Sequence, residues 1–154
     1  MHNKLGLYDE VEGNDATLVN ELLVMMSESR SDYTNTFRAL AMLSTVQQDV
    51  QRLQDHFIDI TKFQSWLKKY RLRINNMELS DKERNEKKTS HNPKYILRNY
   101  LLQDAIEKAK QRDYSEIEIL LKLISNPYEE HEEFEHYSNP PPDWASQIQV
   151  SCSS

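Results

Sequence analysis

Cys152 is the residue whose chemistry stands out first, because it is the only cysteine of the 154-residue chain and lies third from its end. A thiol near a chain terminus readily meets solvent, oxidants or another thiol. No basic residue lies near it in sequence to stabilise a thiolate, so a nucleophilic role would need a base supplied by folding. A redox role needs only exposure and a partner thiol. The alternative is a tail cysteine without a function.

An acidic, histidine-containing cluster near the C-terminus is the candidate metal site. His131 and His136 are five residues apart, not the four that place two imidazoles on one face of a helix. Because zinc-site spacing is absent, we predict a solvated acidic loop and no metal. The cluster consists of Glu130, His131, Glu132, Glu133, Glu135 and His136, while His2, His56 and His91 are isolated and predicted to be structural or exposed.

Two groups of basic residues are candidates for binding anions. The stretch Lys68–Arg73 lies beside Trp66, and phosphate contacts with base stacking would suit a nucleic acid. On a helix these residues spread around the axis, Trp66 and Tyr70 read as core, and the net charge is negative, so we predict no nucleic-acid binding. Lys94 and Arg98 would share one face of a helix, where they pair with acidic side chains or grip an anion. The sequence leaves that choice open.

The charge is distributed in three blocks. The net charge of −6 arises from −6 over residues 1–61, +8 over residues 62–112 and −8 over residues 113–154. Either the middle and the ends attract each other, or the middle faces an acidic partner.

Composition narrows the function classes further. No glycine follows Gly13, and phosphate-cradling loops need glycine, so we expect no nucleotide site built wholly within the chain. We also predict no membrane span and no signal peptide. A single cysteine forms no internal disulfide, which favours a reducing compartment.

Periodic apolar residues predict helices nearly throughout. The expected elements begin near Asp15, Ser31 or Asp32, Thr45, Asp59 or Thr61, Pro93 and Ser115, with capping boxes at Ser80–Glu83 and Ser115–Glu118. Residues 82–90 have almost no apolar side chain and read as a solvated helix or a loop. We therefore predict an all-α fold, an irregular helical bundle of about six helices. Residues 1–126 would form the helical domain and residues 127–154 an extended acidic, Pro-rich tail.

Several segments together resemble one known family. The chain is similar, in order, to the C-terminal region of the selenoprotein O family over nearly its whole length. The likeness is most specific at the Asn-Pro-Lys and Pro-Pro-Pro-Asp-Trp segments, and is vaguer between Thr45 and Ser90. The matching segments are Asn92-Pro93-Lys94-Tyr95-Ile96-Leu97-Arg98-Asn99-Tyr100-Leu101, Ala105-Ile106, Pro127-Tyr128, Tyr137, Pro140-Pro141-Pro142-Asp143-Trp144-Ala145 and Ser151-Cys152-Ser153-Ser154, with weaker matches at Lys4–Leu7 and Asp32–Thr34.

The resemblance implies a function for the longer protein. Members of that family are pseudokinases with a kinase-like fold that transfer AMP from ATP to Ser, Thr or Tyr of proteins. Some members carry selenocysteine at the position of Cys152, which implies a redox-responsive residue here. The family's nucleotide-binding, metal-binding and catalytic residues lie upstream of the matched region, and this chain contains none of those motifs. This chain looks like roughly the last third of a family member, either a fragment of the longer protein or a truncated protein.

We therefore expect a non-catalytic, structural and redox-regulatory region of a protein adenylyltransferase. The chain itself would hold no cofactor, whereas ATP and Mg or Mn are implied for its parent. Expected partners are the rest of the parent chain and, through it, protein substrates. No membrane partner is expected. We also expect the chain to self-associate through apolar surface that the missing part would cover. The resemblance implies a cytoplasmic location in bacteria or a mitochondrial one in eukaryotes. The alternative is an autonomous interaction module that docks through residues 62–112.

Overall fold

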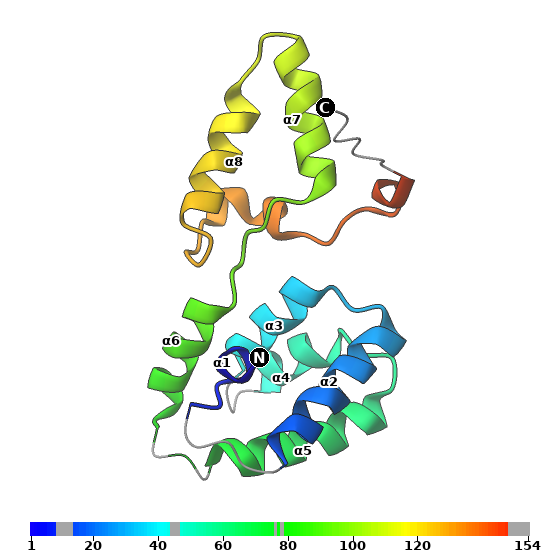
Figure 1. Cartoon of the computed structure of the whole chain (residues 1–154), viewed down its shortest axis with the longest axis vertical. Coiled ribbons are helices and arrows are strands. Elements are labelled where there is room, and N and C mark those ends of the chain that lie inside the picture. The colour runs from blue at the N-terminus through cyan, green and yellow to red at the C-terminus, as the bar shows by residue number, and fades with distance from the viewer. Residues whose placement is uncertain (9–13, 44–46, 76, 78, 148–154) are drawn as a thin grey trace. The chain divides into compact units, whose positions relative to one another are not determined.

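The chain folds into helices alone over the part that the structure describes (Figure 1). The structure is a computed structural model that describes residues 1–8, 14–43, 47–75, 77 and 79–147. All regular elements within these ranges are helical, which confirms the all-α prediction, although the eight α-helices and two 3-10 helices exceed the six or so expected. None of these helices is both long and apolar enough to cross a membrane.

The contacts within the chain define two compact units. The first is Met1–Asn92 and the second is Pro93–Ser154. This boundary differs from the predicted division at residue 126, because Phe134, Tyr137 and Ala145 belong to the same apolar cluster as the helices that precede them. Each unit has its own core and is described by itself.

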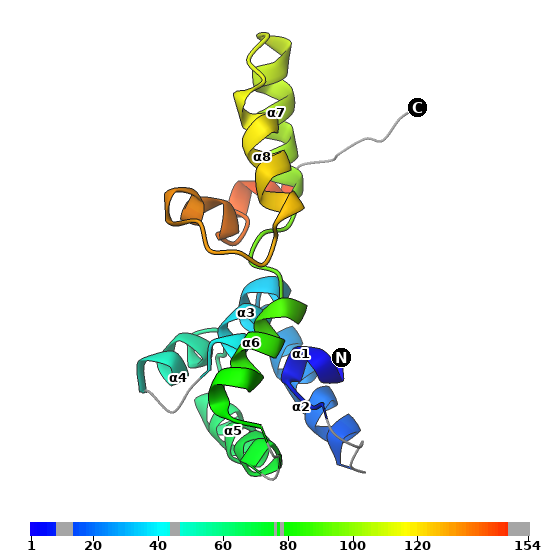
Figure 2. The same cartoon turned by 90° about the vertical axis from the view of Figure 1, so that its left-hand side faces the viewer.

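The first unit is built around two long antiparallel helices. The helices are α1 (His2–Leu5), α2 (Asp15–Ser29), α3 (Tyr33–Ala41), α4 (Gln47–Gln54), α5 (Ile60–Asn75) and α6 (Asp81–His91). Helices α2 and α5 contact each other, and α1 and α3 contact α6 (Figures 1 and 2). The stacked rings of Trp66 and Tyr70 lie in the core, where the indole N–H donates to Leu18 O at 2.9 Å and the phenol donates to Leu5 O at 2.7 Å.

Three predicted helix starts in the first unit are confirmed by their caps. The side chain of Asp32 accepts the amide of Asn35 at 2.9 Å, and that of Asp59 accepts the amide of Lys62 at 2.9 Å. Ser80 and Glu83 form the complete capping box, with both reciprocal bonds present. Each cap satisfies backbone amides that the first turn of a helix leaves without partners.

Residues 82–90, predicted to be a solvated helix or a loop, belong to helix α6. One face of this helix is buried rather than solvated. Arg84 and Lys88 are buried although the helix has almost no apolar residue. Arg84 donates to Ile74 O at 3.1 Å, and Lys88 donates to Leu40 O at 2.9 Å. Both acceptors lie in the last turns of α5 and α3, where the carbonyls carry partial negative charge. Two buried cations therefore cap the C-termini of two neighbouring helices.

Gly6 allows α6 to approach this closely. It ends α1 in the left-handed region, with φ of 79°, which favours glycine. A Cβ atom at this position would lie 2.9 Å from Cγ and Cδ of Lys88. A larger residue would therefore strain the backbone and displace the Lys88 side chain.

The second unit is a helical hairpin with a C-terminal segment folded onto it. Helices α7 (Asn99–Lys110) and α8 (Ser115–Ser125) contact each other and are followed by the 3-10 helices η1 (Glu132–Ser138) and η2 (Asp143–Gln147). The predicted capping box at Ser115–Glu118 is wrong. Instead, Asp113 accepts both the amide of Ser115 at 3.0 Å and its hydroxyl at 2.7 Å, because the preceding turn places that carboxylate over the first helical residue.

Candidate functional site

Asn92, the first residue of the Asn-Pro-Lys segment, joins three helices of the first unit. It is fully buried, and its amide nitrogen donates to Lys4 O at 2.9 Å and to Lys88 O at 3.0 Å. Its backbone carbonyl accepts a hydrogen bond from Arg38 at 3.0 Å, so contacts from α1, α3 and α6 meet at this one residue. A buried amide with its hydrogen bonds formed is characteristic of a structural position.

Pro93 and Lys94 begin the second unit, ahead of its first helix. The amides of Lys94 and Tyr95 both donate to Pro127 O, at 2.7 and 3.1 Å. The Lys94 ammonium binds the carboxylates of Glu130 and Glu135. Burial acts to lower the pKa of Lys94, but the hydrogen bonds to these two carboxylates outweigh it and raise that pKa above its ordinary value.

The helix predicted from Pro93 is therefore wrong in its first turn. It begins at Asn99, with Arg98 as the extended residue before it, so Lys94 and Arg98 do not share a helical face. The hydrogen bonds to Pro127 fix the backbone of residues 94 and 95, and these tertiary contacts override the local preference for proline in a first helical turn. Arg98 is buried, whereas Asn99 is exposed.

The acidic segment after α8 is held by lysines. Glu130 and Glu135 bind Lys94, while Glu133 lies 3.5 Å from the ammonium of Lys122. His131 lies against the ring of Tyr95, whose hydroxyl donates to His131 O at 3.1 Å. No group of three potential metal ligands occurs among the described residues. The arrangement suits charge pairing that closes the segment onto the hairpin.

The Pro-Pro-Pro-Asp-Trp segment lies next to α7. Pro140, Pro141 and Asp143 are exposed and Pro142 is half-buried. The Trp144 ring meets Tyr100 edge-on, with centroids 6.2 Å apart, and the Tyr100 hydroxyl donates to Asn139 O at 3.4 Å. Aromatic pairing anchors this segment, with one face of the indole open to solvent. Cys152, the predicted redox residue, lies outside the described residues.

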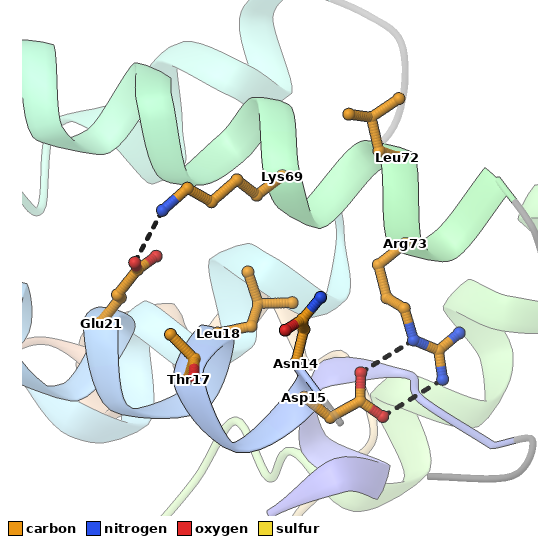
Figure 3. A pocket seen from close by; sticks show the side chains of 8 residues that line it. All are labelled: Asn14, Asp15, Thr17, Leu18, Glu21, Lys69, Leu72 and Arg73. Carbon is orange, nitrogen blue, oxygen red and sulfur yellow. Dashed lines mark hydrogen bonds and ion pairs between the residues drawn. The ribbon is translucent and has the colours of Figure 1, made fainter. Parts of the chain in front are cut away.

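A groove lies between α2 and α5 of the first unit (Figure 3). It has a volume of about 430 Å³ and two ion pairs cross it. Asp15 accepts two hydrogen bonds from Arg73, at 2.8 and 3.2 Å, and Glu21 accepts one from Lys69 at 2.6 Å. The lining residues are Asn14, Asp15, Thr17, Leu18, Glu21, Lys69, Leu72 and Arg73.

Sequence reasoning missed the principal feature of this groove. It placed Asp15 only at the start of a helix, yet the carboxylate is buried against Arg73, 58 residues along the chain. Nothing in the local sequence signals a pair so distant. Since each carboxylate in the groove already holds a cation, the arrangement stabilises the α2–α5 contact and presents no pair of carboxylates for acid–base chemistry.

Comparison with known proteins places the chain in a family. The family model described as protein adenylyltransferase SelO matches residues 1–125. The chain belongs to the SelO family. The matched range contains the Asn92–Asn99 segment, and it ends before Pro140–Trp144. The resemblance inferred from the sequence is thereby confirmed.

Relatives of this SelO-family chain extend the likeness to its C-terminal segment. The chain is 42% identical to the protein nucleotidyltransferase YdiU of Vibrio vulnificus, over 100% of the chain and 32% of that protein. It is 45% identical to the protein of the same name from Burkholderia multivorans, over 100% of the chain and 30% of that protein. The chain thus spans about a third of the length of these relatives.

The basic middle of the SelO-family chain pairs with its acidic ends. In the first unit, Lys62 binds Glu28 at 2.9 Å, in addition to the Lys69 and Arg73 pairs of the groove. In the second unit, Lys108 binds Glu116 at 2.6 Å, in addition to the Lys94 pairs. Of the two interpretations of the charge blocks, these contacts support attraction within the chain.

Proposed function

We propose that this chain is a non-catalytic helical region of a protein adenylyltransferase that transfers AMP from ATP to Ser, Thr or Tyr of proteins. The observation that carries the proposal is a match to SelO relatives over the whole chain but only 30–32% of their length. The structure adds support, because Asn92 and Lys94 of the family segment are occupied with contacts inside the chain. Such contacts stabilise the fold, and side chains that are engaged in them are not available to bind a substrate.

The proposal extends to cofactors and partners. ATP with Mg or Mn would bind to the longer protein, outside the part represented here. The partner of this chain would be the rest of that protein, and protein substrates would be reached through it. A cytoplasmic location in bacteria fits the bacterial relatives.

Transfer of the α-phosphate label of ATP tests the proposal directly. This chain and the full-length Vibrio vulnificus relative would each be incubated with α-labelled ATP, Mg or Mn and a protein mixture. We expect label on protein with the relative and none with this chain at equal concentration, because the resemblance implies that the family's nucleotide-binding and catalytic residues lie upstream of the region that this chain matches. Protein labelling by this chain alone would overturn the proposal.

We further propose that Cys152 acts as a redox-responsive residue of the longer protein. This part rests on the resemblance and on its being the only cysteine of the chain. In an oxidised family member with the equivalent cysteine, we expect peptide mapping without reductant to show it in a disulfide with an upstream cysteine. Recovery of that cysteine as a free thiol after oxidation would contradict the assignment.

The alternative function is docking of an acidic partner on residues 62–112. It is weakened because several basic residues of this range are paired within the chain. Lys62, Lys69, Arg73, Lys94 and Lys108 of that range are paired with carboxylates of the same unit. Intramolecular pairing reduces the positive potential that such a partner would meet. Formation of a salt-sensitive complex between the chain and an acidic protein would support this alternative function.

A further inference from the structure

Helix α8 carries apolar residues on two sides. Leu120 and Leu123 are buried in the core of the second unit. Ile117, Leu121 and Ile124 are exposed, and their spacing of four and three residues places them along one stripe of the helix. A helix that is apolar on both sides normally has a neighbour on both. The exposed stripe therefore marks an interaction surface.

The stripe reads the same in both directions. Tyr114, the N-cap residue of α8, is exposed before it, and Tyr128, in the turn after the helix, is exposed beyond it. The order Tyr114, Ile117, Leu121, Ile124 and Tyr128 is a palindrome about Leu121. Within the helix, the spacing of four residues from Ile117 to Leu121 and of three from Leu121 to Ile124 is that of the seam between packed helices, while Tyr128 lies past the helix end.

We propose that this stripe, Tyr114 to Tyr128, is the surface through which two copies of the chain pair, with their α8 helices antiparallel about a two-fold axis at Leu121. A two-fold interface uses the same patch on both partners, so the patch must be complementary to itself. In this register Leu121 meets Leu121 of the second copy. Ile117 lies within one residue of Ile124 of the second copy along the axis, and Tyr114 and Tyr128 lie equally far from Leu121 in sequence, so residues of similar size come together.

The charges beside the stripe agree with this register. Glu118 and Lys122 are the ionisable residues of α8 between Ile117 and Ile124. In the antiparallel pair, Glu118 of one copy lies within two residues of Lys122 of the other along the axis. Opposite charges flanking a helix seam favour the orientation that brings them together.

The area of the stripe sets the strength of the pairing. Five half-exposed large side chains offer on the order of 500 Å² per copy, taking roughly 100 Å² for each. Stable interfaces bury about 800 Å² per partner, so a dimer through this stripe alone lies at the weak end. We therefore expect monomers and dimers to exchange, with dimers appearing as the concentration rises.

Sedimentation equilibrium over a range of concentrations tests the proposal. All variants carry Cys152→Ser, so that no disulfide links two copies. We expect the mass of the parent to rise from 18.3 kDa towards twice that value, and Leu121→Glu to hold it at the monomer mass. Leu72→Glu on α5 is the matched control, since Leu72 is 61% exposed and Leu121 is 60% exposed. A monomeric parent at all concentrations, or equal losses in both variants, would overturn the proposal.

A charge exchange tests the two-fold register itself. Leu121→Lys and Leu121→Glu should each be monomeric, because like charges would meet on the axis. An equimolar mixture of the two should recover dimers, with one copy of each kind, since opposite charges then meet. Circular dichroism first confirms that both variants are as helical as the parent. A mixture that stays monomeric would show that Leu121 does not meet its own counterpart.

Discussion

Replacing Asp15 by alanine is expected to lower the free energy of unfolding of the first unit by about 3–5 kcal/mol. The carboxylate and the Arg73 guanidinium are both buried and joined by two hydrogen bonds. Removing the carboxylate leaves a buried positive charge without its counterion, and the cost of desolvating that charge is no longer offset. The pair joins α2 to α5, so the loss falls on the central contact of the unit.

Urea denaturation followed by tryptophan fluorescence measures this effect. The variants carry Trp144→Phe, so that buried Trp66 is the only tryptophan and its fluorescence reports on the first unit. Glu21→Ala removes the neighbouring, more exposed ion pair with Lys69 and should cost no more than about 1 kcal/mol. The double variant Asp15→Ala with Arg73→Met should recover part of the loss, because no unpaired charge remains. Equal costs for Asp15→Ala and Glu21→Ala would contradict the expectation.

Replacing Lys88 by methionine is expected to abolish a rise of stability with pH. Burial of the Lys88 ammonium, assisted by the positive charge of Arg84 and opposed by Asp81, lowers its pKa from 10.5 to about 7. Between these values the unfolded chain binds a proton that the folded chain does not, so the free energy of unfolding increases with pH by about 1.4 kcal/mol per unit. Below pH 7 both states are protonated, and this contribution stays at its minimum.

Unfolding free energies at pH 7, 8 and 9 reveal this dependence. The measurements stop at pH 9 so that the tyrosines do not ionise. Burial raises the pKa of Tyr70 and raises that of Tyr8 to about 12. Once the tyrosines of the unfolded chain ionise near pH 10, the free energy of unfolding therefore decreases with pH. We expect the free energy of unfolding of the parent to increase by about 2–3 kcal/mol between pH 7 and 9, and that of Lys88→Met to change less over the same range. Lys82→Met, at an exposed position of the same helix, should keep the parent slope. Identical slopes in parent and Lys88→Met would refute a buried, weakly basic Lys88.

Helix positions and caps were largely predictable, because their determinants are local. Apolar periodicity placed α2, α3 and α5, and Asp32, Asp59 and Ser80 act within three residues of themselves. Two predictions failed for different reasons. Pro127, distant in sequence, holds residues 94 and 95 out of the helix, whereas the local carboxylate of Asp113 takes the place of the predicted capping box at Ser115.

The candidate site follows the same division. The sequence singled out Asn92 and Lys94 through a family resemblance, without indicating what they touch. Apart from Lys88 O, their side chains form hydrogen bonds with residues 36 to 88 positions away, such as Lys4 and Glu130. The helical face of Lys94 and Arg98, inferred from spacing alone, does not exist because that spacing counts only on a helix.

The sequence by itself determined the all-α class, most helix starts and membership of the SelO family, since hydrophobic period, capping chemistry and family segments are written along the chain. Only the tertiary structure decided that Arg84 and Lys88 of a polar helix are buried, that Asp15 binds Arg73, and that α8 presents a second apolar stripe. Burial and ion pairing depend on which segments meet in space, and the polarity of a residue does not fix its depth. A lysine is placed in a core when a carbonyl in the last turn of a helix, such as Leu40 O, is there to accept its hydrogen bond.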